Sequence, residues 1–342
     1  MHTNVVKATE ENLEEISQIA AKALKAGDVI VMPTETVYGL AASAFDDAAV
    51  RHIYEVKGRP QDNPIIVHIS DYIMLNDVAA DISDEALLLA KRFWPGPLTM
   101  VLKKTDAVSP VVTCGGDTVA VRMPSHPVAA SIISTSGLPL AAPSANISGK
   151  PSPTSAQHCI DDLTGKVSLI VDGGKCDVGV ESTVISLVSD PPTVLRPGII
   201  SIDDIREVLP NAEVSPSVFE KVKKGEKVLS PGLKYKHYSP NAKVILIEGP
   251  LDRFCDYVES HSGSGVFAMC FDGEEESIPI PSMSYGPKGN ARIQSQKLFS
   301  VLRAMDKIGA ATVYVRAPES TGTAMAVFNR LIRAAGFEVI QL

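Results

Sequence analysis

The 342-residue sequence has no run of eighteen apolar residues, and its N-terminus, MHTNVVKATEENLEE, is acidic and polar where a signal peptide would be basic and then apolar. We therefore expect no membrane span and no secretory leader, but a soluble protein of the cytoplasm. The five cysteines are odd in number, widely spaced and never in a CxxC pair, which argues against a disulfide framework and a zinc site. Reduced thiols are the simplest expectation.

Several catalytic signatures are missing as well. The chain contains no GxxxxGK[ST] phosphate loop and no GxGxxG dinucleotide fingerprint. It also contains no HExxH helix, no Ser-His-Asp order and no evident pair of catalytic carboxylates. The sequence therefore predicts neither hydrolysis by a protein nucleophile nor a metal held by protein ligands alone.

The net charge of −8 argues against a protein that binds nucleic acid through general electrostatic attraction, because such proteins carry a basic domain. Cations nevertheless gather locally. Segments rich in Gly, Pro and Ser contain Lys57, Arg59, Arg122, Lys150, Arg196, Lys234 and Lys236. An acidic protein whose cations are concentrated in loops is suited to a small anionic ligand.

The length and a hydrophobic content of 45% predict more than one core. The first part reads as an α/β domain with a mixed sheet, which ends near residue 205. Its strand-like segments are 29–32, 65–69, 98–102, 119–122, 140–142, 169–171 and 183–187, and its helix-like segments are 47–56 and 84–93. Residues 211–240 are rich in Pro, Gly and Lys toward their end and read as a linker.

From residue 243 onward, strand-like and helix-like segments alternate regularly. This alternation predicts a small parallel sheet covered by helices. Because the dinucleotide fingerprint is missing, a Rossmann-like shape here is no evidence of cofactor binding. The segments are KVILIEG, 253–259, GVFAMCF, 291–308, ATVYVRA, 324–335 and EVIQL.

The stretch KGRPQDNPIIVHI, residues 57–69, is the most informative. It places two permanent cations, Lys57 and Arg59, in a Gly/Pro loop that leads directly into an apolar strand buried on both faces. Loops of this kind hold anions. His68 interrupts the strand, and a single histidine there is more often a satisfied core residue than a ligand.

Two other strand ends carry polar groups. PTETVYGL, residues 33–40, presents Thr34, Thr36 and Tyr38 either to a ligand or as caps of a turn. Glu35 between them is compatible with a position facing solvent. In VAVRMPSHP, Arg122 ends a short apolar strand, where its guanidinium either grips a carboxylate or phosphate or forms a structural ion pair.

The remaining motifs are weaker individually. WPGPLTMVL contains the chain's one tryptophan, Trp94, for which packing is favoured over ligand stacking. APSANISGKPSPT offers hydroxyls and backbone N–H groups in a loop that cannot be helical, a composition that wraps phosphates. ESTVISL and LRPG add Ser182 and Arg196 at strand ends. Many fixed cations and hydroxyls without a nucleophile fit nucleotidyl transfer by positioning and charge stabilisation.

Taken together and in order, the motifs resemble those of the threonylcarbamoyl-AMP synthase family, over essentially the whole chain. The resemblance implies a YrdC-like catalytic domain in residues 1–210, with an open twisted mixed sheet and helices. It further implies a linker and active-site lid in 211–240 and a small Rossmann-like α/β domain in 241–342. The motifs are PTETVYGL, KGRPQDNPIIVHI, WPGPLTMVL, VAVRMPSHP, APSANISGKPSPT, ESTVISL, LRPG and SPGLKYKHYSP. Departures are small: Glu35, Leu233 and Lys236 replace the family's more usual Asp, Met and Arg.

The family activity implied is a nucleotidyltransferase reaction that joins L-threonine, bicarbonate or CO2, and ATP into threonylcarbamoyladenylate and pyrophosphate. Mg2+ would be carried with ATP. The product would pass to a tRNA threonylcarbamoyl transferase for modification of tRNA. Direct binding of tRNA by this chain is left open, as are its oligomeric state and the role of the C-terminal domain.

The resemblance also assigns site residues. Lys57 and Arg59 would act in catalysis by neutralising charge near the reacting phosphate and carbamate. The ATP side would consist of Arg59, Asn63, Thr118, Ser144, Ser152, Arg196 and Tyr235. The threonine side would consist of Thr36, His68, Arg122, Ala142 and Ser182, with Arg122 on the carboxylate.

Three rival interpretations remain. An RNA-binding module conflicts with the acidic net charge. A carbamoyl-adenylate-forming domain of the hydrogenase-maturation type would carry zinc-binding CxxC pairs, which this chain lacks. A regulatory nucleotide sensor without turnover would release no pyrophosphate.

Overall fold

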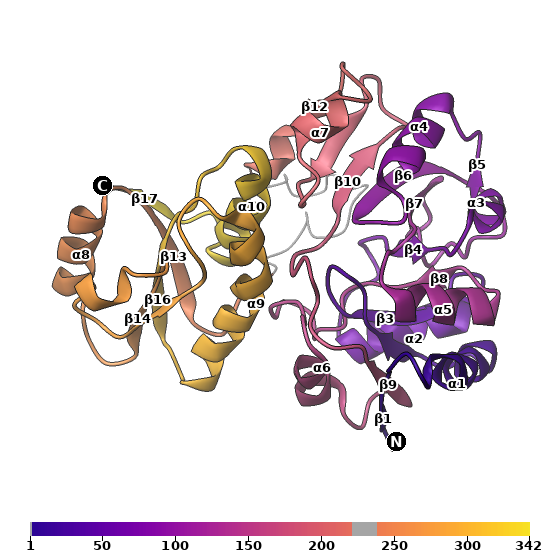
Figure 1. Cartoon of the computed structure of the whole chain (residues 1–342), viewed down its shortest axis with the longest axis horizontal. Coiled ribbons are helices and arrows are strands. Elements are labelled where there is room, and N and C mark those ends of the chain that lie inside the picture. Colours follow the sequence, from indigo (N-terminus) through magenta and orange to yellow (C-terminus); the bar gives the residue numbers. More distant parts are fainter. Residues whose placement is uncertain (1, 221–237) are drawn as a thin grey trace.

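The computed structural model describes residues 2–220 and 238–342. These residues form two α/β parts that lie side by side (Figure 1). The first surrounds a mixed sheet within residues 4–214, and the second surrounds a parallel sheet within residues 243–341. The fold class predicted from the sequence is confirmed. The boundaries 1–210, 211–240 and 241–342 stay a prediction, because the middle of the predicted linker lies outside the described residues.

The first sheet contains twelve strands in the order β1-β9-β2-β3-β8-β4-β7-β6-β10-β11-β12, with β5 paired to β6. All strands predicted here are present. Its strands are β1 (Asn4–Lys7), β2 (Ile30–Met32), β3 (Gly39–Ser43), β4 (Ile66–His68), β5 (Ala79–Ala80), β6 (Leu98–Lys104), β7 (Thr118–Arg122), β8 (Leu140–Ala141), β9 (Leu169–Asp172), β10 (Thr183–Ser186), β11 (Thr193–Arg196) and β12 (Glu213–Val214). The helices of this part are α1 (Leu13–Lys25), α2 (Asp47–Lys57), α3 (Tyr72–Val78), α4 (Asp84–Phe93), α5 (Pro127–Ser136), α6 (Ala156–Leu163) and α7 (Ile202–Arg206), with a 3-10 turn at Pro216–Val218.

Helix α2 shows how local sequence sets the position of a cation. The Asp46 carboxylate accepts hydrogen bonds from the backbone N–H groups of Ala48 and Ala49, at 2.9 and 3.1 Å, and so caps the first turn. The helix ends at Gly58, whose φ of 60° is the left-handed conformation that glycine adopts without strain. The sequence had suggested that Lys57 lies in a loop. The structure shows instead that it is the last residue of helix α2.

Strand β4 is buried on both faces, as predicted. Ile65, Val67 and Ile69 on one face are at most 1% exposed, and Ile66 and His68 on the other face are 7% and 3% exposed. The strand pairs in parallel with β7 and antiparallel with β8. This parallel register sets His68 directly beside Arg122. Strand pairing thus brings together two motifs that lie far apart in the sequence.

Trp94 belongs to the core of the first part, and its indole Nε1 donates to the Leu98 carbonyl at 2.7 Å. The preference for packing over ligand stacking is confirmed. All five cysteines are free thiols, as expected. Within residues 2–220 and 238–342, no helix has both the length and the apolar composition needed to cross a bilayer.

The second sheet has the order β15-β14-β16-β13-β17, and all its pairs are parallel. Its strands are β13 (Lys243–Glu248), β14 (Val266–Cys270), β15 (Ser282–Ser284), β16 (Thr312–Arg316) and β17 (Val339–Gln341). Helix α8 (Leu251–Ser260) covers one face, and α9 (Ala291–Lys307) and α10 (Met325–Ala334) cover the other, with 3-10 turns at Glu275–Ser277 and Gly322–Ala324. Helices α9 and α10 face the first part (Figure 1).

Candidate active site

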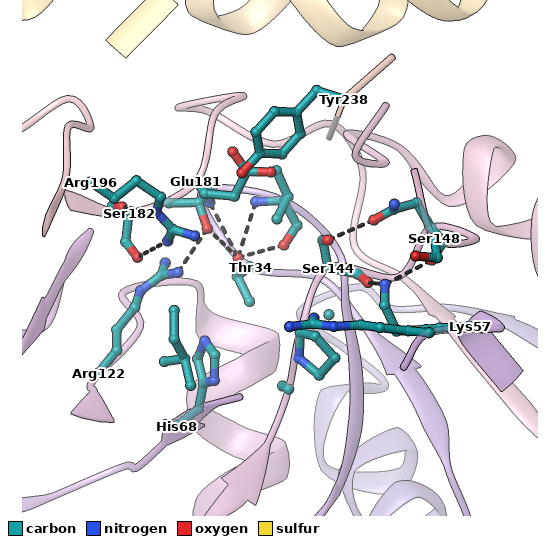
Figure 2. Close-up of a pocket in the computed structure, with 18 of the residues that line it drawn as sticks. Thr34, Lys57, His68, Arg122, Ser144, Ser148, Glu181, Ser182, Arg196 and Tyr238 are labelled. Atoms are coloured by element: carbon teal, nitrogen blue, oxygen red, sulfur yellow. Dashed lines mark hydrogen bonds between the residues drawn. The ribbon is translucent and has the colours of Figure 1, made fainter. Parts of the chain in front are cut away.

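A cavity of about 710 Å³, counted out to its mouth, lies where several strands of the first sheet end. Most of the residues predicted for the site line it: Thr36, Lys57, Arg59, His68, Arg122, Ala142, Ser144, Ser182 and Arg196. Figure 2 shows Lys57, Ser144 and Ser148 on one side, Arg122, Ser182 and Arg196 on the other, and Tyr238 opposite His68.

Three predicted site residues within the described part of the chain are not among those lining the cavity. Thr118 lies at the start of β7, and Ser152 is buried, where its hydroxyl donates to Glu181 Oε1. Asn63 is fully buried, and both polar atoms of its side chain lack a hydrogen-bond partner. Tyr235 lies outside the described residues. Their roles on the ATP side stay predictions.

Lys57 fixes the loop that follows β8. Its ammonium donates to the Ser144 carbonyl and, at 2.7 Å, to the Asn146 carbonyl. The Asn146 side chain in turn accepts from the Ser144 hydroxyl at 2.6 Å and donates to the Lys150 carbonyl at 2.9 Å. These contacts hold the loop beside the cavity, in the non-helical conformation that the sequence predicts.

The charge of Lys57 is less permanent than the sequence suggests. Burial, reinforced by the neighbouring Arg59 cation, lowers the pKa of Lys57 well below its usual range. A bound anion would act in the opposite direction, because an opposite charge favours the protonated form. An anion bound in the cavity would therefore raise the pKa of Lys57 back toward its usual range.

Arg59 keeps unused hydrogen-bonding capacity. Its Nη2 donates to the Asn63 carbonyl at 2.8 Å, but its buried Nε has no hydrogen-bond partner. Burial lowers the pKa of Arg59, although a guanidinium retains its proton in proteins. A fixed cation with an unpaired buried N–H favours an anionic ligand.

Arg122 forms the structural ion pair that was one of its two predicted roles, and it also lines the cavity. Its Nη2 lies 2.7 Å from Glu35 Oε1 in a buried ion pair, and its Nη1 donates to the Thr36 hydroxyl at 2.8 Å. The angles of this contact are poor for a hydrogen bond, so Arg122 Nη2 and both Glu35 oxygens have no well-aligned hydrogen-bond partner. Glu35 is 5% exposed, and the expectation that it faces solvent was wrong. Burial raises the pKa of Glu35, but the Arg122 charge outweighs this and holds that pKa below its usual value.

His68 is buried beside Arg122, and its Nδ1 has no hydrogen-bond partner. Burial, followed by the Arg122 charge, lowers the pKa of His68 to about 3, so the ring is neutral near pH 7. A neutral imidazole offers one ring nitrogen to a ligand as a donor or an acceptor, depending on the tautomer. The unpaired Nδ1 favours the ligand interpretation over that of a satisfied core histidine.

Ser182 and Arg196 are held together at the ends of β10 and β11. Arg196 donates from Nε to the Ser182 carbonyl and from Nη2 to the Ser182 hydroxyl, both at 3.1 Å. The same hydroxyl lies 2.7 Å from the Thr99 hydroxyl. Ala142 completes this side, with its backbone N–H donated to the Ile66 carbonyl at 2.9 Å.

The site residues assigned from the sequence leave out several that line the cavity, among them Asn146, Glu181 and Tyr238. Asn146 and Glu181 stand inside motifs that had been recognised, and only the contacts with Lys57 and Ser152 reveal their importance. Tyr238 stands three positions after Tyr235 in the same aromatic and basic segment. The aromatic and basic composition of that segment was the signal from which Tyr238 could have been predicted as a site residue.

The chemistry of this cavity follows from its two sides. One side combines two cations with a fixed loop of carbonyl, hydroxyl and amide groups. The other combines two guanidinium groups, a neutral imidazole and hydroxyls. Buried donors without partners occur on both sides, and each such group favours a ligand that satisfies it. The cavity can therefore bind two anionic groups next to each other without a protein nucleophile.

The chain matches two family models. Residues 22–198 match the Sua5/YciO/YrdC model, which is described as "Telomere recombination". Residues 200–336 match the model of the threonylcarbamoyl-AMP synthase C-terminal domain. The two matches follow each other along the chain.

Full-length relatives are similar throughout. Threonylcarbamoyl-AMP synthase of Pyrococcus abyssi is 44% identical over 97% of this chain and 98% of its own length. The Bacillus subtilis protein of the same name is 43% identical over 96% of this chain and 95% of its own. The structure of P. abyssi Sua5 complexed with L-threonine matches with a TM-score of 0.91 and 42% identity, and it covers the whole of both chains.

Proposed function

This chain belongs to the threonylcarbamoyl-AMP synthase family, and from that premise we propose how its cavity carries out the reaction. The enzyme is a nucleotidyltransferase of tRNA processing that makes L-threonylcarbamoyladenylate and releases pyrophosphate. The observation that carries the proposal is the meeting of both predicted half-sites in one cavity, with unpaired buried donors on each side.

Threonine is proposed to bind on the side of Arg122. Its carboxylate would satisfy the Arg122 guanidinium, whose pairing with Glu35 is close but poorly aligned. Its ammonium and hydroxyl would meet Thr36, the unpaired His68 Nδ1 and the Ser182 hydroxyl. The structure of P. abyssi Sua5 with L-threonine supports a threonine site in this fold.

ATP is proposed to bind on the side of Lys57 and Arg59, with its phosphates beside Ser144 and the loop that Lys57 holds. Arg196 would contact the nucleotide from the opposite wall. Magnesium would enter as part of the ATP complex, coordinated largely by the phosphates. The phosphate charge would keep Lys57 protonated.

The chemistry has two steps. The threonine ammonium first loses a proton to solvent. Its nitrogen then bonds to the carbon of bicarbonate or CO2 and becomes a carbamate; with bicarbonate, water leaves, and with CO2, a second proton leaves. A carbamate oxygen then attacks the α-phosphorus, the bond to the β-phosphate oxygen breaks, and pyrophosphate leaves. Lys57 and Arg59 would stabilise the charge that builds up on the phosphate, since fixed cations in a buried site need little reorganisation.

The product is an anhydride that water destroys, so it must be used soon after it forms. We propose that it passes to a transferase that acts on tRNA. The net charge of −8 gives no support to strong binding of tRNA by this chain itself.

The test is pyrophosphate release with ATP alone, with threonine or bicarbonate added singly, and with both. We expect release only when both are present, because the attacking oxygen belongs to the carbamate that they form together. Equal release without threonine would contradict the proposal. A direct control is D-threonine, which presents the same groups with the wrong handedness and should not replace the L-isomer.

A further inference from the structure

Arg330 is a charged side chain with no exposed surface, and it crosses from one part of the molecule to the other. It lies in helix α10 of the second part. Its Nε donates to Glu181 Oε2 at 2.8 Å, its Nη2 to the Glu181 carbonyl at 3.1 Å, and its Nη1 to the Pro197 carbonyl at 2.7 Å. These three acceptors belong to the first part, whereas a fourth, Asn329 Oδ1, accepts from Nη1 at 3.2 Å within α10 itself.

The acceptors in the first part flank two residues of the active site. Glu181 directly precedes Ser182, and Pro197 directly follows Arg196. Ser182 and Arg196 line the cavity and bond to each other. One planar guanidinium therefore ties the start of β10 to the end of β11, which is a geometry that an ammonium cannot reproduce.

The contact between Arg330 and Glu181 also has an electrostatic effect. The buried Glu181 carboxylate is ion-paired with Arg330, and its other oxygen accepts from the Ser152 hydroxyl. Burial raises the pKa of Glu181, but Arg330 first and Arg196 next lower it below the usual value. Without Arg330, the Glu181 charge would be balanced mainly by Arg196. The electrostatic potential in the cavity would also become more negative, which weakens the binding of an anionic ligand.

We propose that Arg330, although absent from the cavity wall, is a positioning residue that holds Ser182 and Arg196 in place and offsets the negative charge of Glu181 beside them. This inference rests on the proposed function, because it assigns the two residues it positions to the substrates. It also gives the C-terminal part a role in the reaction: its helix α10 supplies one buried contact that the first part lacks on its own.

The experiment compares Arg330→Met and Arg330→Lys with the full-length wild type. We measure kcat and KM for threonine and ATP, and the calorimetric affinities for threonine and a non-hydrolysable ATP analogue. Both variants should lose roughly 10- to 100-fold in kcat/KM, with a raised KM for both substrates, because small displacements near a reacting centre have effects of that size. A purely structural role would lower the folded fraction and kcat but leave KM and affinity unchanged in the folded protein.

Arg316→Met is the matched control. Arg316 is also a buried, ion-paired arginine of the second part, but its partners Glu274 and Gly249 both lie in that part. Its loss should reduce stability without a change in either affinity. If Arg330→Met does not fold, Arg330→Lys decides, since it keeps a cation beside Glu181. A folded Arg330→Lys with wild-type KM values and affinities overturns the inference.

The two proposals fail in different ways. A wild-type protein that releases no threonine-dependent pyrophosphate contradicts the proposed function. A wild-type protein that does so, with Arg330→Lys equally active and equally tight in binding, contradicts only the positioning role.

Discussion

The two parts of the molecule share a plan but differ in how far their polar groups are satisfied. Each has a hollow at strand ends and a buried arginine there in an ion pair: Arg122 at the end of β7 and Arg316 at the end of β16. Arg316 is fully engaged. It donates twice to Glu274, at 3.1 and 3.0 Å, and once to the Gly249 carbonyl, at 2.7 Å.

The hydrogen-bonding groups of Arg122 and of its neighbours Glu35 and His68 are satisfied to a lesser degree. Its Nη2, both Glu35 oxygens and the His68 Nδ1 lack hydrogen-bond partners. In the second hollow, about 1020 Å³ to its mouth, no side chain among the described lining residues has a buried polar atom without a partner. A hollow at strand ends is thus not enough to indicate a site. The unsatisfied buried groups distinguish the catalytic cavity from its structural counterpart.

The largest expected effect tests this difference directly. Arg122→Ala should weaken threonine binding by roughly 2–5 kcal/mol, or about 30- to 4,000-fold, because a desolvated charge pair loses one partner. Arg316→Ala should lower stability and leave threonine affinity unchanged. Titration calorimetry with threonine measures the affinity of both variants. Wild-type affinity in folded Arg122→Ala would make Arg122 a structural ion pair like Arg316 and remove the contrast.

The next effect concerns the lysines of the two hollows. Lys57→Ala should lower kcat by about 10²–10³-fold, the usual result of removing one fixed donor from a developing charge. The loop around Ser144 and Asn146 would also lose its anchor. Lys288→Ala, which changes the second hollow, should leave pyrophosphate release unchanged. A large loss of turnover in Lys288→Ala would show that the second hollow takes part in the reaction.

Much of this fold could be predicted from the sequence because its signals are local. Apolar runs such as residues 65–69 marked buried strands, and regular alternation after residue 243 marked the parallel sheet. The motif residues were also local signals, and most of those assigned to the site do line one cavity. The roles of these residues were assigned from the resemblance of the motifs to a known family, because the spacing of the residues alone does not indicate them.

The remainder depends on contacts between distant segments. Glu35 was expected to face solvent because nothing near it in the sequence shows that the fold places Arg122 beside it. The Arg330–Glu181 pair joins residues 149 positions apart in different parts of the molecule. Buried ion pairs of this kind leave no periodic pattern, so a single sequence does not reveal them.

A smaller effect is expected for the choice between amino acids. Serine should be accepted about 10- to 200-fold less well than threonine in kcat/KM, because one missing methyl in a fitted pocket is worth only about 1–3 kcal/mol. Competition between the two substrates in the pyrophosphate assay measures the ratio. Discrimination of several thousandfold would require a checking step beyond the one cavity described here.

The smallest effect is a pH dependence of stability that belongs to the catalytic part. His68 has a pKa of about 3 in the folded protein, lowered by burial and then by Arg122, against an ordinary value of 6.5. Below pH 6.5 the unfolded chain therefore binds a proton that the folded chain does not. The stabilisation is complete above 6.5 and is lost progressively as the pH falls toward 3, with a slope of at most about 1.4 kcal/mol per pH unit.

The His68→Gln variant isolates this contribution, since it removes the titrating group while keeping a polar side chain. Urea unfolding followed by the fluorescence of Trp94 reports on the first core, because that tryptophan is the only one and lies there. Between pH 6.5 and 5 the wild type should lose stability faster than the variant. Glu35 and Glu181, whose pKa values are lowered from 4.5, contribute only at more acidic pH. Equal slopes would mean that His68 can be protonated in the folded protein, and the neutral ring assigned to the threonine side would then be wrong.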